Sequence, residues 1–199
     1  AVVMPMDFAR LPVLTAVGVA LYAEDLQWAV LAGAAGGLAW AMIPALLKVR
    51  FGTNEILVSL MLVYVAESVL ASVSSGLLQN PDGMGFPGSR NLAQWDAVAN
   101  RELVAGTGMH WGVGAAFVAV IAAYILMSRH ILGFQLRLSG AAPRAARFAG
   151  VTPGRVALTC FAISGALAGM AGFFEVAGPA GQISIDFGSF YGFTAIIVA

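Results

Sequence analysis

The chain has few charged residues and one cysteine. Of its 199 residues, ten are Lys or Arg and ten are Asp or Glu, whereas 60% are hydrophobic. So little charge cannot cover the surface of a soluble domain of this length, and the composition excludes that class. The formal net charge of zero gives no bulk attraction to nucleic acid, so no nucleic-acid partner is expected. The single Cys160 excludes an intramolecular disulfide and argues against a cysteine metal cluster.

The sequence also lacks the patterns of a catalytic protein. It contains no G-x-x-x-x-G-K-[ST] phosphate-binding loop, so ATP hydrolysis is not expected on this chain. It contains no convincing Ser/His/Asp or Cys/His arrangement. His110 and His130 fall at opposite ends of one apolar run, so they cannot hold one metal ion. We therefore predict that the chain is not an enzyme and binds no metal or cofactor itself.

The N-terminus does not resemble a signal peptide. The stretch "AVVMPMDFAR" has no basic start followed by an apolar run and a cleavage site. The chain begins without Met and stops inside the apolar stretch "GFTAIIVA". We expect it to be a fragment of a longer protein.

The sequence contains long apolar runs, and its mean hydropathy is +0.87. A helix needs about 20 residues to cross roughly 30 Å of hydrocarbon. Four runs are long enough: Trp28–Leu47, Ile56–Ser75, Trp111–Ser128 and Val156–Phe174. They do not alternate polar and apolar residues as barrel strands do, so helices are expected. We predict an all-α polytopic membrane protein, with residues 1–199 forming a single domain. Leu11–Tyr22 and Tyr191–Ala199 are predicted to be incomplete spans at its two ends.

The charge of the connecting segments alternates along the chain. Segment 48–55 has two basic residues and one acidic residue, and segment 129–155 has five arginines and no acidic residue. Segment 23–27 has two acidic residues, and 76–110 has two basic and three acidic residues. Under the positive-inside rule, 48–55 and 129–155 are cytoplasmic and the other two are outside. The five arginines are Arg129, Arg137, Arg144, Arg147 and Arg155.

The 129–155 loop has a helical signal at its centre. Pro143 stands at a permissible helix start and Gly150 at a plausible stop. Arg144 and Arg147, three residues apart, would share one edge of this helix. The other side would carry the small or apolar residues Ala145, Phe148 and Ala149. Such an amphipathic helix would lie beside the membrane and present its arginines to water or to a partner. A plain positive-inside anchor explains the charges equally well.

Three stretches resemble the permease subunit of bacterial ABC importers. They are "FGTNEILVSLMLVYVA" (51–66), "LGFQLRLSGAAPRAARFAGVTPGR" (132–155) and "SGALAGMAGFFEVAG" (164–178). The similarity runs from about Trp28 to the end of the chain. It is greatest to the nucleoside branch, which neighbours the simple-sugar and branched-chain amino-acid permeases. The chain departs from the family phrases at Val63 and Ala142, where Asn is common, and at Arg144, where Glu is common.

The resemblance implies a transport subunit of a bacterial inner-membrane importer, with a nucleoside as cargo. A simple sugar or a branched-chain amino acid is the alternative cargo. The implied partners are a second permease subunit, an extracytoplasmic substrate-binding protein, membrane lipid and a cytoplasmic ATPase subunit that carries ATP and Mg. The loop 129–155 would couple to this ATPase through Arg137, Arg144, Ala145, Ala146, Arg147 and Gly150. An ATP-independent secondary transporter, coupled to an ion through Glu67, is the other function considered.

Polar residues within or beside the spans are candidates for the substrate path: Tyr64, Glu67, Glu175, Gln182 and Tyr191. Glu67 lies mid-span, where insertion costs about 2.5–3.5 kcal/mol, so it should face protein or water. Tyr64 and Ser74 are expected to share its helix face. A structural carboxyl between helices is the alternative for Glu67, as a structural role is for Glu175.

Small residues in the last complete span predict close helix packing. The stretch "SGALAGMAG" places Gly165 and Gly169 on one side of a helix, with Gly172 near that stripe. Packing inside this subunit is favoured over a contact between subunits.

The outer loop 76–110 is turn-rich and polar; it could receive the external binding protein or act as a simple tether.

Overall fold

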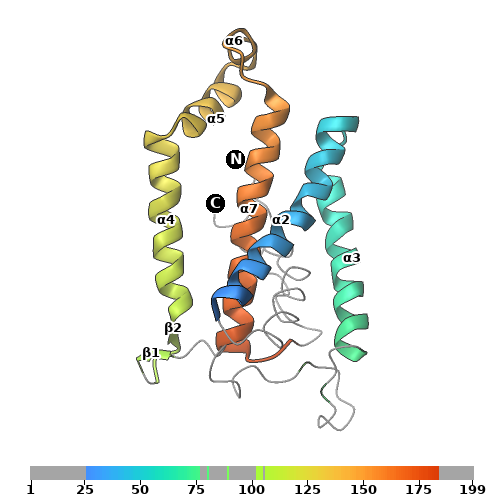
Figure 1. Cartoon of the computed structure of the whole chain (residues 1–199). Helices are drawn as coiled ribbons and strands as arrows, with labels where there is room; N and C mark the ends of the chain where they lie inside the picture. Colours follow the sequence, from blue (N-terminus) through green and yellow to red (C-terminus); the bar gives the residue numbers. More distant parts are fainter. Residues whose placement is uncertain (1–25, 77–79, 81–88, 90–101, 105, 184–199) are drawn as a thin grey trace.

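Four long helices, two short ones and a small hairpin make up the part of the chain that the computed structural model describes, residues 26–76, 80, 89, 102–104 and 106–183. The elements are α2 Leu26–Phe51, α3 Glu55–Ser75, β1 Glu102–Val104, β2 Met109–His110, α4 Trp111–Arg129, α5 Ile131–Ala141, α6 Pro143–Phe148 and α7 Pro153–Glu175, followed by a π-helical turn, Val176–Ala180 (Figure 1). The incomplete spans predicted at both ends, and most of loop 76–110, lie outside the described residues.

The prediction of an all-α polytopic membrane protein is confirmed. Within the described residues, α2, α3, α4 and α7 are long and apolar enough to cross a membrane. Each contains one of the four predicted spans. The helices extend beyond the uncharged runs, because a helix can continue through the headgroup region until a residue stops it. The strands β1 and β2, which the sequence did not predict, pair antiparallel just before α4.

The turn between α2 and α3 is fixed by local interactions. Gly52 has φ +65°, and its N–H donates to the Lys48 carbonyl oxygen at 2.9 Å, which ends α2. Asn54 caps α3 by accepting a hydrogen bond from the Ile56 N–H at 3.0 Å. Lys48 Nζ and Glu55 Oε1 form an ion pair of 2.5 Å across the turn. These contacts hold the two helices as an antiparallel hairpin.

The packing of α2 against α7 forms the centre of the fold. A stripe of small residues, each four positions from the next and all buried, runs along α2: Ala29, Gly33, Gly37, Ala41 and Ala45. Gly165 and Gly169 of α7 face this stripe. A Cβ atom on Gly37 would clash with the Gly165 carbonyl oxygen and lie 2.9 Å from the Gly169 Cα. The two backbones therefore touch directly, as small residues allow in lipid.

Helix α4 joins the rest of the structure mainly at its C-terminal end. None of its residues is buried. At the elbow into α5, His130 Nδ1 accepts a hydrogen bond from the Leu132 N–H at 3.3 Å. Gly133 is buried there, and a Cβ atom on it would lie 2.6 Å from the Met127 Cα. The elbow needs glycine at this position because the backbone of α4 occupies the space of a side chain.

The contact between α2 and α7 predicts a stability difference between two Gly→Ala variants. Gly37→Ala adds a methyl group where a backbone already lies, so we expect a loss of about 1–3 kcal/mol. Gly114→Ala, in α4, adds the same group where no atom lies within 4 Å. It should be neutral or slightly stabilising, because alanine favours helix. Thermal unfolding in detergent measures both, and equal midpoints would contradict the direct contact.

Candidate functional site

The basic segments meet at one end of the bundle. The turn between α2 and α3 lies at the same end as α5 and α6, whereas β1, β2 and the C-terminal end of α3 lie at the other (Figure 1). This is the arrangement that the alternation of charge requires. The predicted loop 129–155 is itself helical for most of its length, because α5, α6 and the first turn of α7 fall within it.

Helix α6 ends in a complete glycine-terminated cap. Gly150 has φ +77°, a conformation that favours glycine. The Val151 N–H donates to the Ala146 carbonyl oxygen at 2.9 Å, and the Gly150 N–H donates to the Arg147 carbonyl oxygen at 3.1 Å. These two bonds define a Schellman motif, with a buried pair, Ala146 and Val151, beneath it. The predicted start at Pro143 and stop at Gly150 are confirmed.

Of the six residues of α6, all but Ala146 are exposed. Ala146 is fully buried and is the residue of α6 that faces the protein. Arg144, Ala145 and Arg147 are exposed, and Phe148 has an exposed fraction of 94%. In Figure 1, α6 forms the tip of the structure, beyond the ends of α4 and α7. That α6 is an amphipathic helix lying beside the membrane stays a prediction.

Arg137 lies on α5 and interacts with α4. Its guanidinium donates a hydrogen bond to the Met127 carbonyl oxygen in the last turn of α4. A cation at a helix C-terminus stabilises the carbonyl groups that lack partners there. This bond joins the end of α4 to α5, and through α5 to α6. Arg137 is therefore placed to hold the tip rather than to extend from it.

On α3 the predicted polar stripe is partly covered by the protein. Ser74 is fully buried, with Ser59, Val63 and Leu70, on the side of α3 that packs. Tyr64 has an exposed fraction of 68%, and Glu67 is partly exposed. Helical spacing keeps Tyr64, Glu67 and Ser74 on one side of α3, as predicted. The protein covers Ser74 and leaves Tyr64 exposed.

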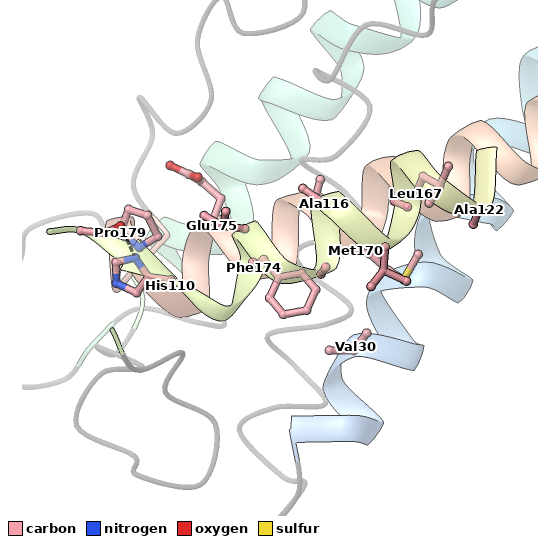
Figure 2. Close-up of a pocket in the computed structure, with 16 residues that line it drawn as sticks. Val30, His110, Ala116, Ala122, Leu167, Met170, Phe174, Glu175 and Pro179 are labelled. Carbon is pink, nitrogen blue, oxygen red and sulfur yellow. Dashed lines mark hydrogen bonds between the residues drawn. The ribbon is translucent and has the colours of Figure 1, made fainter. Parts of the chain in front are cut away.

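Glu175 borders a cavity between α4 and α7. The cavity has a volume of about 710 Å³ and is mostly apolar. Figure 2 shows Glu175 and His110 at one end of it and Leu167 and Ala122 at the other. His110 Nδ1 lies 2.8 Å from the Gly108 carbonyl oxygen, in hydrogen-bond contact.

The sequence carried a signal for this cavity that the prediction missed. Five of the seven α4 residues that line it are small and spaced at helical intervals: Gly112, Ala115, Ala116, Ala119 and Ala122. Their spacing places them on one face of the helix. His110, at the end of the hairpin, is a polar residue that lines this cavity and not a metal ligand candidate alone.

The remaining candidates lie around the end of α7. Gly172, like Gly165 and Gly169, is buried. Gln182 is exposed, just after the π-helical turn, and Tyr191 lies outside the described residues. Beside Gln182, the Ile183 N–H donates to Ser89 Oγ at 2.9 Å, and the Ser89 N–H donates to the Ile183 carbonyl oxygen at 3.0 Å. This buried pair of bonds joins Ser89, in the segment between α3 and β1, to the segment that follows α7.

The predicted path residues are divided between two places. Tyr64 and Glu67 lie on α3, which contacts α2, whereas Glu175 faces the cavity beside α4. In Figure 1, α3 and α4 stand on opposite sides of the pair formed by α2 and α7. The described residues therefore do not bring Glu67 and Glu175 into one site. No group of three His, Cys, Asp or Glu residues that could hold a metal occurs among the described residues.

These features define a class: polytopic α-helical membrane proteins with a short helix displayed at the basic end. Comparison with known families identifies the particular one. The chain belongs to the family described as branched-chain amino acid transport system / permease component, whose model matches residues 7–199. It is therefore a transport subunit of the ABC permease type.

Relatives with curated names transport sugars or nucleosides according to those names. The chain is 35% identical over 180 residues to the glucose ABC transporter permease protein TsgB13 of Haloferax volcanii, covering 85% of this chain and 46% of the relative. It is 31% identical to the guanosine ABC transporter permease protein NupP of Bacillus subtilis, covering 84% and 48%. It is 26% identical to the nucleoside ABC transporter permease protein NupB of Lactococcus lactis, covering 72% and 41%.

The chain thus spans about half the length of the curated relatives it matches. No solved structure gives a significant match. These comparisons support the predicted nucleoside and sugar branch of the family. The names of the relatives include both a sugar and nucleosides as cargo.

The charge at the two ends predicts which end is cytoplasmic. In a Cys160→Ala background, Thr107→Cys places a thiol in the turn of the hairpin, and Phe148→Cys places one at the exposed tip of α6. An impermeant thiol reagent should label Thr107→Cys in intact cells, and Phe148→Cys only after the membrane is permeabilised. Labelling of Phe148→Cys in intact cells would reverse the orientation.

Proposed function

We propose that the chain is the membrane-spanning part of an ATP-driven importer in the bacterial inner membrane, and that α6 is its coupling helix. The observation that carries this proposal is the geometry of α6. One residue, Ala146, fixes the helix to the protein, while two arginines and Phe148 extend from the tip. ATP and Mg would be bound by a separate ATPase subunit, against which this tip docks.

The exposed residues of α6 suit a protein partner. A nearly fully exposed phenylalanine is an apolar anchor of the kind that fills a pocket in an interface. Arg144 and Arg147 can form forked hydrogen bonds to carboxylates. A positive-inside anchor would need the arginines but not the aromatic residue. The proposed partner surface is therefore a groove with an apolar floor and acidic walls.

Movement of α6 would reach two spans. Helix α6 contacts both α5 and α7. The Schellman motif joins it rigidly to the start of α7, and α5 is joined to the end of α4 through Gly133 and Arg137. Closure of ATPase subunits around ATP would thus displace α4 and α7 together. This is a rigid-body route from the nucleotide to the membrane.

The proposed cargo is a nucleoside. Two of the three relatives are named for guanosine or nucleoside transport, and the third for glucose, so a sugar is the second candidate. We place the path along the side of α3 that carries Tyr64 and Glu67, facing a second permease subunit. An external binding protein would deliver the solute at the end that carries the hairpin. In cells, uptake of labelled guanosine is measured with excess unlabelled glucose, and uptake of labelled glucose with excess unlabelled guanosine. These two measurements distinguish the two cargoes.

The coupling role predicts that Gly150→Leu breaks the connection between this chain and the ATPase subunit. A Cβ atom on Gly150 meets nothing within 4 Å, so the strain expected at this position comes from its φ of +77° rather than from a clash at Cβ. Left-handed backbone costs other residues about 1–2 kcal/mol, which should disturb the end of α6. In the complete transporter we expect normal membrane insertion, but loss of substrate-stimulated ATP hydrolysis and of co-purification with the ATPase.

Gly140→Leu is the matched control for this experiment. Gly140 lies in α5, also has open space around it, and is not among the glycines with positive φ. It receives the same side chain without the backbone strain and should keep its ATPase partner. Normal ATPase activity in Gly150→Leu, or equal loss in both variants, would contradict the coupling role of the α6 cap.

The path along α3 predicts that Glu67→Gln lowers uptake by about tenfold, through the loss of hydrogen bonds made by a charged group. Glutamine keeps the size of the side chain and removes its ability to ionise. Glu102→Gln, on the exposed strand β1, removes a carboxyl of the same type outside the spans. Uptake into cells, with ATPase co-purification as the assembly check, should separate them. Unchanged uptake in Glu67→Gln would make Glu67 a structural residue.

A further inference from the structure

The cavity beside Glu175 is one of three that follow one another along α7. A second cavity, of about 490 Å³, lies between the ends of α4, α5 and α7, and shares Leu167 with the first. A third, of about 290 Å³, lies between α5, Gly150 and the start of α7. It shares Leu132, Gln135, Val156 and Thr159 with the second. Because neighbouring cavities share lining residues, we treat the three as one groove that follows α7 from the basic end of the protein to the opposite end.

The groove is polar at its basic end and apolar further along. The third cavity is lined by Gln135, Thr152, Arg155 and Thr159, and its polar and apolar surfaces are of similar extent. Arg137 borders the second cavity, whose lining is otherwise mostly apolar. No Asp or Glu lines either of these two cavities among the described residues. The mouth of the groove therefore favours an anionic group and offers no carboxylate to an amine.

The length of this part of the groove matches one leaflet of a bilayer. Arg155 and Leu167 are twelve positions apart on α7. At 1.5 Å per residue in a helix, that separation is about 18 Å. Half of the hydrocarbon core is about 15 Å thick. A molecule with its charge at Arg155 and an acyl chain reaching Leu167 would have the dimensions of a phospholipid in the cytoplasmic leaflet.

We propose that this groove binds an anionic phospholipid, with its phosphate at Arg155 and Gln135 and an acyl chain between α4 and α7. The lipid matches both parts of the groove, because its phosphate meets the unopposed positive charge and its chain covers the apolar wall. A packed helix would cover the apolar wall and leave the basic mouth unmatched. Basic pockets between membrane helices on the cytoplasmic side suit such headgroups. The bound lipid would wedge α4 and α7 at a fixed separation.

The test measures lipids retained by the purified protein. The protein is incubated in detergent with phosphatidylglycerol or phosphatidylcholine of the same acyl chains, and bound lipid is counted by native mass spectrometry. Wild-type protein should retain phosphatidylglycerol about fivefold more than phosphatidylcholine, the preference expected from one basic residue. Arg155→Gln should remove this preference. Arg50→Gln removes a charge at the same end of the bundle, away from the groove, and should keep it.

A second variant tests the apolar part without changing charge. Ser164 lines the second cavity, and Ser164→Phe would fill space there. It should lower retention of both lipids, while the thermal midpoint shows that the protein is folded. Soluble glycerol 3-phosphate should not displace the lipid; displacement would indicate a phosphate site instead. Equal loss in Arg155→Gln and Arg50→Gln, or no lipid retained because another helix fills the groove, would also overturn the proposal.

Discussion

The direct contact between the backbones of α2 and α7 is the constraint on which the other helices depend. In lipid no hydrophobic effect drives two apolar helices together, so close approach and dispersion must do so. Glycine at positions 37, 165 and 169 allows that approach. Glycine lowers the stability of a helix relative to alanine, and the close contact offsets this loss. Because the two helices are antiparallel, their contact brings the turn before α3 and the start of α7 to the same end. The basic segments are gathered there as a consequence.

Helix α4 is attached to the protein in a different way from α2 and α7. Its attachment is made at the elbow, through Gly133, His130 and Arg137, rather than along its length. The small residues of α4 border open volume, whereas those of α2 meet another backbone. The same pattern of small residues thus produces a closed contact in one place and a groove in the other, according to whether a second glycine stripe faces it.

The spans could be predicted from the sequence because the thickness of the bilayer converts length and hydropathy directly into helices. The end of α6 could be predicted for a similar reason, since Pro143 and Gly150 act through local backbone preferences. The separation of Glu67 from Glu175 could not, because it depends on which helices are neighbours. The stripe from Ala29 to Ala45 was visible in the sequence. It was not recognised as the partner of the glycines in α7, since spacing alone does not say what a stripe faces. Helix α5 was missed because the tight contact at Gly133 appears only when the chain folds back on α4.

The stability of α6 comes mainly from its C-terminal end. Ala142 stands at its N-cap without a side-chain hydrogen bond. Alanine at an N-cap is typically about 0.5–2 kcal/mol less stable than Asn, Asp or Ser there. Pro143 offsets part of this by fixing φ at the first helical position, and the Schellman motif with Ala146 and Val151 fixes the other end. The orientation of the tip therefore depends on residues that do not extend from it. Arg144 adds a positive charge to this tip. On the proposed function, the partner that fits this chain must carry an acidic group opposite Arg144.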